Sequence, residues 1–278
     1  MRQERSDAIG CTIGAKILEP DAEYVLFKNK DLNFDTFEDE LAVDPDRFGI
    51  AGLHIPPPEL QAGEVRSGFS IGLNAKGVSA CNSHVRSIAG GQNYDLLTEA
   101  AVTGTASTAE ACERVIDEAA KGDFNWSNII VADSQTVAIL EIGRHVEHVR
   151  ELPQVARANQ HLLPGSDAAA ASPCPRGARI ISAIETVQSV DDVLALLRSH
   201  EGRDEKSAFC SHGERGGKTV YSYAVHWRRG EFAFCVQQGP PCLGEYVQIP
   251  LGFPLDRDKV VATYPGALSS SGSAGKRS

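Results

Sequence analysis

The stretch Cys11-Thr-Ile-Gly-Ala-Lys-Ile17 leads through Glu19-Pro-Asp-Ala22 into Glu23-Tyr-Val-Leu-Phe-Lys28 and decides how the fold begins. Apolar residues alternate with others in the first run, and the second run is rich in aromatic and branched side chains. The Pro-Asp pair between them is typical of a turn, so we expect an antiparallel hairpin. A second hairpin is predicted over Phe69 to Cys81, with its turn at Asn74-Ala-Lys-Gly77.

The middle of the chain changes to a helical period. Between Tyr94 and Ala120, apolar residues recur at spacings of three and four, which predicts two helices. A helix is also expected over 190–200, capped by Ser189 or Asp191. The other predicted elements are strands within Ser127–Glu141, strands at Val146–Leu152 and Gln154–Asn159, a helix at Arg176–Glu185, and strands at Thr219–Trp227 and Glu231–Gln237.

Two segments are predicted to lie outside the regular elements. The charged residues 35–47, followed by Pro56-Pro57-Pro58, indicate a surface excursion. Residues 259–278 are expected to form a flexible tail, because Ala267 to Ser278 is rich in Ser, Gly and Ala.

The order of the predicted elements indicates the fold class. Strands, then helices, then strands, without steady alternation, favour an α+β domain in which mainly antiparallel sheets pack on helices.

Composition restricts the class of protein. The 278 residues carry a net charge of -10, which argues against nucleic acid as a partner. No apolar run approaches the roughly 20 residues that span a bilayer. The charged start Met1 to Gly10 lacks the apolar core of a signal peptide, so a cytoplasmic protein without a membrane partner is expected. Seven cysteines, an odd number in a long chain, are expected to be mostly reduced and buried.

Cys11 follows Gly10 directly and opens the first predicted strand. By itself it reads as a buried strand cysteine, because free cysteine is among the most buried residue types. Four further features sit at predicted strand ends. Each has an ordinary interpretation as a turn residue or strand terminator. They are Lys28-Asn29-Lys30-Asp31, Asn82 after the Gly72–Val78 hairpin, Asn159 within Arg157–His161, and Gly239-Pro-Pro-Cys242 with Gly244-Glu-Tyr246.

Taken together, these motifs resemble the cysteine N-terminal-nucleophile hydrolases related to acyl-coenzyme A:6-aminopenicillanic acid acyltransferase, and more distantly bile salt hydrolase and penicillin V acylase. The resemblance covers about residues 10 to 250. Gly10-Cys11-Thr12 is similar to the self-cleavage junction, and Lys28 to Asp31 is similar to Arg-Asn-x-Asp. Asn159-Gln-His161 resembles Thr-Asn-His. Gly72–Val78 and Gly239–Tyr246, which resemble a Gly-Met-Asn-Glu-x-Gly-Leu hairpin and a Gly-Pro-Pro-Cys closing strand, are the more specific matches.

The resemblance implies a four-layer αββα fold over residues 11–258, with Met1 to Gly10 removed as a propeptide. It implies that Asp31 holds the α-amino group of Cys11 and that Lys28 favours the thiolate. It also implies that the amides of Asn82 and Asn159 meet an oxyanion. The chain departs from the family at two positions: Lys28 replaces an arginine, and Ser211 in Phe209-Cys-Ser-His212 replaces another, for which Arg215 is a candidate substitute.

An N-terminal cysteine carries its own base, since a free α-amino group has a pKa of about 7.7 to 8.0 and can take the thiol proton. Attack on a small-molecule amide then gives an acyl-thioester on Cys11. Water would make the chain an amidohydrolase, and a second amine or thiol would make it an acyltransferase. We expect no cofactor, and association of identical chains is left open.

The sequence admits three rival interpretations. A metal site has little support, because Cys210, His212, Cys235, Cys242, His226 and His161 lack the usual Cys-x-x-Cys or His-x-x-x-His spacing. A serine hydrolase has none, because no Gly-x-Ser-x-Gly occurs. The third is an unprocessed, non-catalytic binding protein with the same fold, which the two missing arginines favour.

Overall fold

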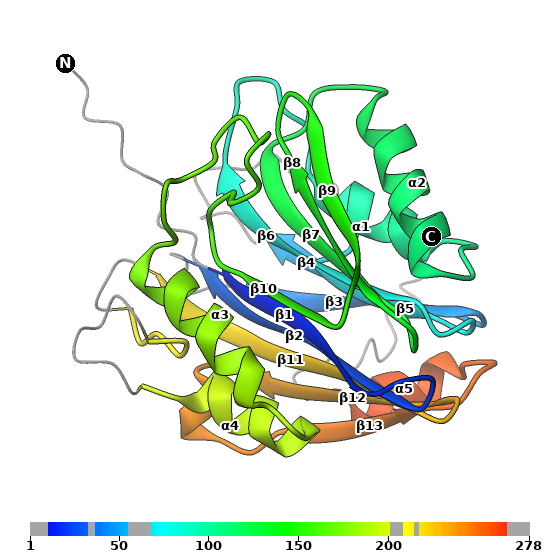
Figure 1. Ribbon diagram of the computed structural model, residues 1–278. Coiled ribbons are helices and arrows are strands. Elements are labelled where there is room, and N and C mark those ends of the chain that lie inside the picture. The colour runs from blue at the N-terminus through cyan, green and yellow to red at the C-terminus, as the bar shows by residue number, and fades with distance from the viewer. Residues whose placement is uncertain (1–10, 33–36, 55–67, 201–207, 214–216, 266–278) are drawn as a thin grey trace, which may run out of the picture.

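The computed structural model describes residues 11–32, 37–54, 68–200, 208–213 and 217–265 (Figure 1). Within them, the first sheet has six strands, and each neighbouring pair runs antiparallel. The predicted first hairpin forms its centre, with Cys11 opposite Lys30 in the register. The strand order is β10 (Gln154–Arg157), β1 (Cys11–Glu19), β2 (Glu23–Leu32), β11 (Lys218–Arg228), β12 (Glu231–Gln238), β13 (Val247–Leu251).

The second sheet has seven strands that follow one another in chain order, which makes it an antiparallel meander. Its order is β3 (Phe37–Asp44), β4 (Arg47–His54), β5 (Ile71–Asn74), β6 (Ser79–Arg86), β7 (Trp126–Ala132), β8 (Val137–Ile142), β9 (Val146–Leu152). The predicted hairpin at Phe69 to Cys81 is β5–β6. Its turn places Gly77 at a φ of 94°, where a side chain would be strained.

Helices cover the outer face of each sheet. The helices α1 (Asp95–Val102) and α2 (Thr108–Ala119) pack on the seven-stranded sheet, and α3 (Pro175–Thr186) and α4 (Val190–Arg198) pack on the six-stranded sheet (Figure 1). As predicted, Ser189 caps α4 by accepting a hydrogen bond from the Asp192 N–H. The four layers confirm the expected α+β, αββα architecture.

Three apolar clusters hold the layers together. The largest lies between the two sheets and includes Tyr24, Phe48, Tyr223 and Phe234. The other two lie between each sheet and its helices. Burial on both faces explains why a central strand such as β8, in which every residue is buried, is apolar except for Glu141.

Strand β2 is central to the site because its side chains alternate between two layers. Lys28 and Lys30 lie on the side of Tyr24 and Leu26, which faces the other sheet, and we call this the inner face. Asn29 and Asp31 lie on the side that contacts α3 and α4, which we call the outer face.

Residues 37–47 are not a surface excursion, so that prediction is wrong. They form β3 and the turn into β4. Leu41 and Val43 pack against the core between the sheets, while Glu40 is exposed. Asp39 lies on the same inward face of β3 as Leu41 and Val43, where it accepts hydrogen bonds from Tyr223 and Tyr264. A charged residue at this position makes the alternation of apolar and polar residues hard to recognise in the sequence.

The C-terminal predictions also need correction. The tail does not begin at residue 259, because α5 (Arg257–Thr263) continues past it and Val260 and Tyr264 are buried. Gly239 to Tyr246 is not a closing strand: it contains the 3-10 helix η2 (Pro241–Leu243), and the final strand starts at Val247. The ranges 1–10, 56–58 and 267–278 lie outside the described residues.

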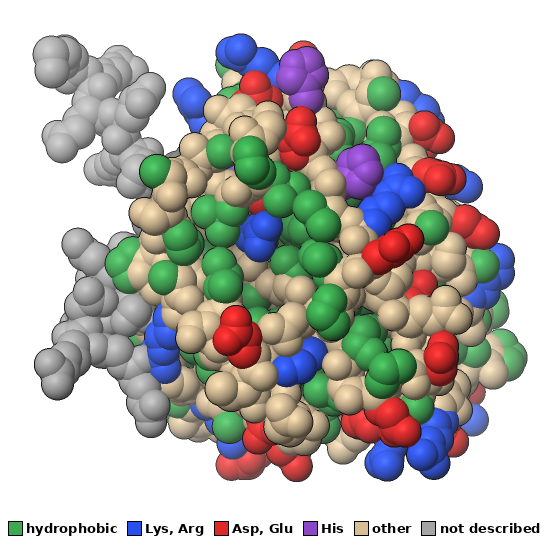
Figure 2. Space-filling view, viewed as in Figure 1, with side chains coloured by type: hydrophobic (Ala, Val, Ile, Leu, Met, Phe, Trp, Pro, Cys, Tyr) green, Lys and Arg blue, Asp and Glu red, His purple; other side chains and the backbone are tan. Residues whose placement is uncertain are grey.

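The surface and the helix lengths give two further observations. Side chains of both charge signs are interspersed over the face seen in Figure 2, so no broad basic area appears there. Among the described residues, no helix combines the length and the apolar run that crossing a lipid bilayer would need.

Candidate active site

Cys11 is the first residue of β1 and its side chain is only 3% exposed. It shares a face of the strand with Ile13 and Ala15, which belong to the core between the sheets. The thiol therefore lies between the two sheets, at the end of the strands where the described chain begins.

The backbone nitrogen of Cys11 is held by a side chain rather than by a neighbouring strand. Its N–H donates to Asn159 Oδ1 at 3.0 Å. The pairing of β1 with β10 ends at Ile13 and Arg157, so Asn159, two residues beyond β10, takes the place that a strand carbonyl would have. The Asn159 Nδ2 donates to His84 O at 2.6 Å, which fixes the orientation of the amide.

A charged network stands behind Asn159. Arg176 Nη2 donates to Asn159 Oδ1 at 2.6 Å, and Arg176 Nη1 forms an ion pair with Asp31 Oδ2 at 2.8 Å. Thr219 Oγ1 donates to the other oxygen of Asp31 at 2.7 Å. Asp31 was expected to hold the Cys11 nitrogen, and the structure links the two through Arg176 and Asn159.

Arg176 was missed as a site residue by the sequence analysis, which placed it only in a helix. It lies in the first turn of α3, and Pro175 before it is a common first helical residue. Nothing in that pattern distinguishes it from a surface arginine, because its partners are 17 and 145 residues away.

Lys30 lies directly opposite Cys11 on the inner face of β2. Burial lowers the pKa of Lys30 to about 8, while Asp39, Asp95 and the Cys11 thiolate act in the opposite direction. Lys30 is therefore the buried cation directly opposite Cys11. Sequence reasoning assigned the role of favouring the thiolate to Lys28, because Lys28 stands where the related family has an arginine.

Lys28 is on the same face but diagonal to Cys11, opposite Ile13. Its Nζ donates to Asn82 O at 2.7 Å, to Asn82 Oδ1 at 2.9 Å and to Ser70 O at 3.3 Å. These contacts tie β2 of one sheet to β6 of the other, which gives Lys28 a structural task between the layers.

The Asn82 side chain is fully engaged as a donor. Its Nδ2 lies 3.0 Å from Phe69 O, 2.8 Å from Asp95 Oδ1 and 2.8 Å from Thr98 Oγ1. An amide nitrogen has two hydrogens, so in this arrangement Asn82 keeps none for an oxyanion. The structure thus brings Asn159 to Cys11 and directs the Asn82 donors to helix α1 and to Phe69, just before β5.

Several other motif residues have structural partners. Asn74 binds the carbonyls of Val102 and Thr105. His161 is buried, which lowers its pKa, and its Nε2 lies 3.1 Å from Ser127 O. Ser211 donates to Gly217 O at 2.5 Å. Arg215, the suggested substitute for the missing arginine, lies outside the described residues.

A hollow of about 600 Å³ lies among the described residues, away from Cys11. Ile17, Pro20, Asp133 and Arg150 are among its lining residues, so it lies at the far end of β1. One set of side chains in the described part of the chain has metal-ligating geometry: His200, Cys210, His212 and Cys242, near Asp31 but separate from Cys11.

No protein-family model matches the chain. A comparison of the sequence with curated proteins also finds no match. The similarity that exists is to solved structures. A mutant of the conjugated bile acid hydrolase from Clostridium perfringens aligns with a TM-score of 0.40 and 10% identity, over 83% of this chain and 89% of that chain.

Two further solved structures are similar at the same level. The N-acylethanolamine-hydrolyzing acid amidase ortholog of Caenorhabditis elegans gives a TM-score of 0.45 and 12% identity, over 78% of this chain and 99% of that chain. Penicillin V acylase from Agrobacterium tumefaciens gives 0.45 and 11%, over 86% of each chain. These values are too low to assign a family, so the functional argument rests on the residues around Cys11.

Proposed function

We propose that the chain is a cysteine amidase for small molecules, with Cys11 as an N-terminal nucleophile exposed by cleavage after Gly10. The observation that carries the proposal is the hydrogen bond from the Cys11 nitrogen to Asn159 Oδ1. A half-buried Asn–Arg–Asp network is an elaborate partner for an ordinary strand N–H. It suits a nitrogen that becomes a free amine and has to be oriented.

The α-amino group is the proposed base. After cleavage, one N–H would still donate to Asn159 Oδ1, which leaves the nitrogen lone pair free to accept the thiol proton of the same residue, directly or through one water. A free α-amino group has a pKa of about 7.7 to 8.0, close to neutral pH. The positive charge of Arg176, one contact away, opposes protonation of the amine and so keeps more of it in the basic form.

Lys30 is the proposed cation for the thiolate. It lies opposite Cys11 and is buried, so little water screens the interaction. Lys28 is engaged by the Ser70 and Asn82 carbonyls, and Cys11 is not its direct cross-strand neighbour. We therefore move the activating role from Lys28 to Lys30.

The reaction would proceed through two covalent steps. The thiol proton passes to the α-amine, sulfur attacks the amide carbon, and the oxygen takes the negative charge. The Asn159 Nδ2 gives one hydrogen to His84 O, and its second hydrogen, which has no partner among the described residues, is the proposed donor to that oxygen. The α-ammonium returns the proton to the leaving amine, and the acyl-thioester remains on Cys11.

The second step decides between two activities. Water attack on the thioester releases a carboxylic acid and makes the chain an amidohydrolase. Attack by another amine transfers the acyl group. We favour hydrolysis, because the net charge of -10 does not favour a polyanionic acyl donor such as coenzyme A.

The test uses protein expressed at full length and cleaved after Gly10. It is assayed with a panel of N-acyl p-nitroanilides that carry short, long and aromatic acyl groups. At least one should release p-nitroaniline, and acid-quenched samples should carry the acyl mass on the peptide that begins with Cys11. Addition of glycinamide then separates hydrolysis from transfer by the fraction of acyl-glycinamide formed. Turnover without any adduct on Cys11 would contradict the proposal.

A non-catalytic binding protein is the second candidate. Two observations favour it: the Cys11 side chain is 3% exposed, and both donors of Asn82 are already used. It predicts no cleavage after Gly10 and no reaction of Cys11 with iodoacetamide in the folded protein. Cleaved protein in which iodoacetamide labels Cys11 and blocks turnover would exclude it.

A further inference from the structure

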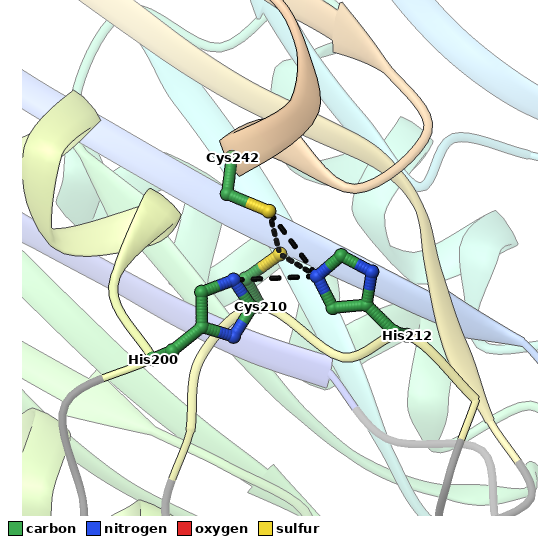
Figure 3. A group of neighbouring side chains, drawn as sticks. All are labelled: His200, Cys210, His212 and Cys242. Carbon is green, nitrogen blue, oxygen red and sulfur yellow. Dashed lines mark hydrogen bonds between the residues drawn. The ribbon is translucent and has the colours of Figure 1, made fainter.

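Four metal-ligating side chains converge beside the outer face of β2 (Figure 3). We call them the Cys/His cluster: His200, Cys210, His212 and Cys242. His200 follows the C-terminal cap of α4, Cys210 and His212 lie in the segment 208–213, and Cys242 lies in η2. Each contributes one ligand atom, and these atoms all lie within 4.8 Å of one another.

Four of the six separations are close to those of a tetrahedral site, and the two from His200 to the sulfurs lie within the 4.8 Å span of the cluster. Zinc bonds of about 2.3 Å to sulfur and about 2.0 to 2.1 Å to nitrogen place two sulfurs about 3.8 Å apart, two nitrogens about 3.4 Å apart and mixed pairs about 3.6 Å apart. The two sulfurs are 3.6 Å apart and the two Nε2 atoms are 3.3 Å apart. The mixed pairs from His212 Nε2 are 3.9 Å to Cys210 Sγ and 3.2 Å to Cys242 Sγ.

Neither a disulfide nor hydrogen bonding alone accounts for this geometry as well as a bound cation does. A disulfide between Cys210 and Cys242 would need about 2.05 Å between the sulfurs, well short of 3.6 Å. Hydrogen bonding alone is a weak explanation, because the two thiols are weak donors to the two imidazole nitrogens. A central cation explains why both Nε2 atoms and both sulfurs point at one place (Figure 3).

We propose that the Cys/His cluster binds one zinc ion. Two cysteines and two histidines in a tetrahedral arrangement are a typical zinc donor set. Four protein ligands leave no open position for water or substrate, which is characteristic of structural rather than catalytic zinc. His200 and His212 are exposed, so the ion can enter from solvent.

The zinc ion would hold in place the segment that positions Thr219, which in turn donates a hydrogen bond to Asp31. The Ser211 N–H, between the two ligands of its segment, donates to Thr219 Oγ1 at 3.0 Å, and the Thr219 N–H donates to Ser211 O at 2.9 Å. The same Thr219 hydroxyl donates to Asp31 at 2.7 Å. Zinc binding is independent of the proposed amidase function, whereas its effect on the Cys11 site rests on that function.

The first experiment measures metal in tag-free, full-length protein purified with a reductant and without chelator, then incubated with zinc and desalted. We expect about one zinc per chain by inductively coupled plasma mass spectrometry. Replacement by cobalt should give thiolate-to-cobalt absorption and the ligand-field bands of a tetrahedral site. Absence of both stoichiometric zinc and these bands overturns the proposal, as does an intact mass about 2 Da low from a Cys210–Cys242 disulfide.

Variants then assign the ligands. Cys242→Ser and His200→Ala should each hold less than about 0.1 zinc per chain after desalting. Loss of a residue that only hydrogen-bonds to a ligand typically lowers metal affinity roughly 10- to 100-fold, and loss of a ligand itself should lower it further. The controls are Cys174→Ser, a half-buried cysteine whose sulfur caps α3 as a serine also can, and the exposed His148→Ala. Both controls should retain full zinc.

Outcomes of the variant series separate the two proposals. Zinc retained in both Cys242→Ser and His200→Ala contradicts the assigned site, whatever the amidase activity. If a variant does not fold, the cobalt spectrum of the unmodified protein still decides whether two thiolates bind the metal. Failure of the amidase proposal would leave the zinc stoichiometry unchanged.

Discussion

The two faces of β2 contribute different things to one site. On the inner face, Lys30 lies opposite Cys11, and the groups nearby are those that change charge during the proposed reaction. On the outer face, Asp31 holds Arg176, and the Cys/His cluster lies close by. The proposed reacting groups therefore lie on one face of the six-stranded sheet, and the groups that position them lie on the other face. Asn159, which contacts both Cys11 and Arg176, connects the two.

The largest expected effect belongs to the inner face. Cys11→Ala should abolish cleavage after Gly10 and lower turnover at least about 10⁴-fold, because the nucleophile is removed. The measurement is intact mass together with p-nitroaniline release. Cys81→Ala is the matched control: Cys81 is also buried, and burial raises the pKa of its thiol to about 12, so it is unreactive. Equal loss in both variants would mean that the effect is structural.

Asn159→Ala tests the link between the two faces. It removes the acceptor of the Cys11 nitrogen and the proposed oxyanion donor, so kcat should fall about 10²- to 10³-fold while the thermal midpoint changes little. Asn74→Ala is the comparison, because Asn74 is a buried amide whose hydrogen bonds hold the backbone around the β5–β6 turn, so that variant should lose stability rather than kcat. An unchanged kcat in Asn159→Ala would remove this residue from the site.

Lys30→Gln should lower kcat/KM roughly 10-fold at pH 7, because it removes the cation opposite the nucleophile. The pH dependence is the sharper readout. The pKa of Lys30 is lowered to about 8, so its charge is present below pH 8 and lost above it, and the activity of the unmodified enzyme should decline there. Lys30→Gln should lack that decline. Lys28→Gln should instead mainly reduce stability, because it unties the two sheets.

The smallest effect is expected from Asp39→Asn. Asp39 raises the pKa of Lys30, so its neutral replacement should move the alkaline decline to lower pH. The stability change has a defined sign. Burial raises the pKa of Asp39 to about 6, so its contribution to folding is fully present below pH 4 and lost as pH rises through 6. Asp39→Asn should therefore gain stability relative to the unmodified chain between pH 4 and 7 in urea titrations, and a loss across that range would contradict the account.

The inner face was largely predictable from the sequence, because local patterns carry it. Cys11 and Lys30 lie in one hairpin, and alternation in a hairpin fixes which side chains are opposite. The motif resemblance nonetheless indicates Lys28 as the partner of the thiolate, whereas we propose Lys30. The register of the hairpin decides between the two lysines, and a motif resemblance does not contain the register.

The outer face was not predictable, because its partners are distant in the chain. Arg176 meets Asp31 across 145 residues, and Cys242 meets Cys210 across 32. The Cys/His cluster draws on three separate segments, so the sequence lacks the short spacing that marks most zinc sites. Strand β3 was not predicted for a different reason. Its inward-facing residue Asp39 is charged, and it accepts hydrogen bonds from a tyrosine of the other sheet and a tyrosine of the C-terminal segment.

The intact mass of the purified chain tests the central claim most directly. The account predicts a loss of Met1 to Gly10, about 1.1 kDa, in the unmodified protein and in Cys81→Ala, and full length in Cys11→Ala. A full-length mass for the unmodified protein, stable on prolonged incubation at pH 7 to 8, would contradict Cys11 as an N-terminal nucleophile and leave the binding-protein interpretation in its place.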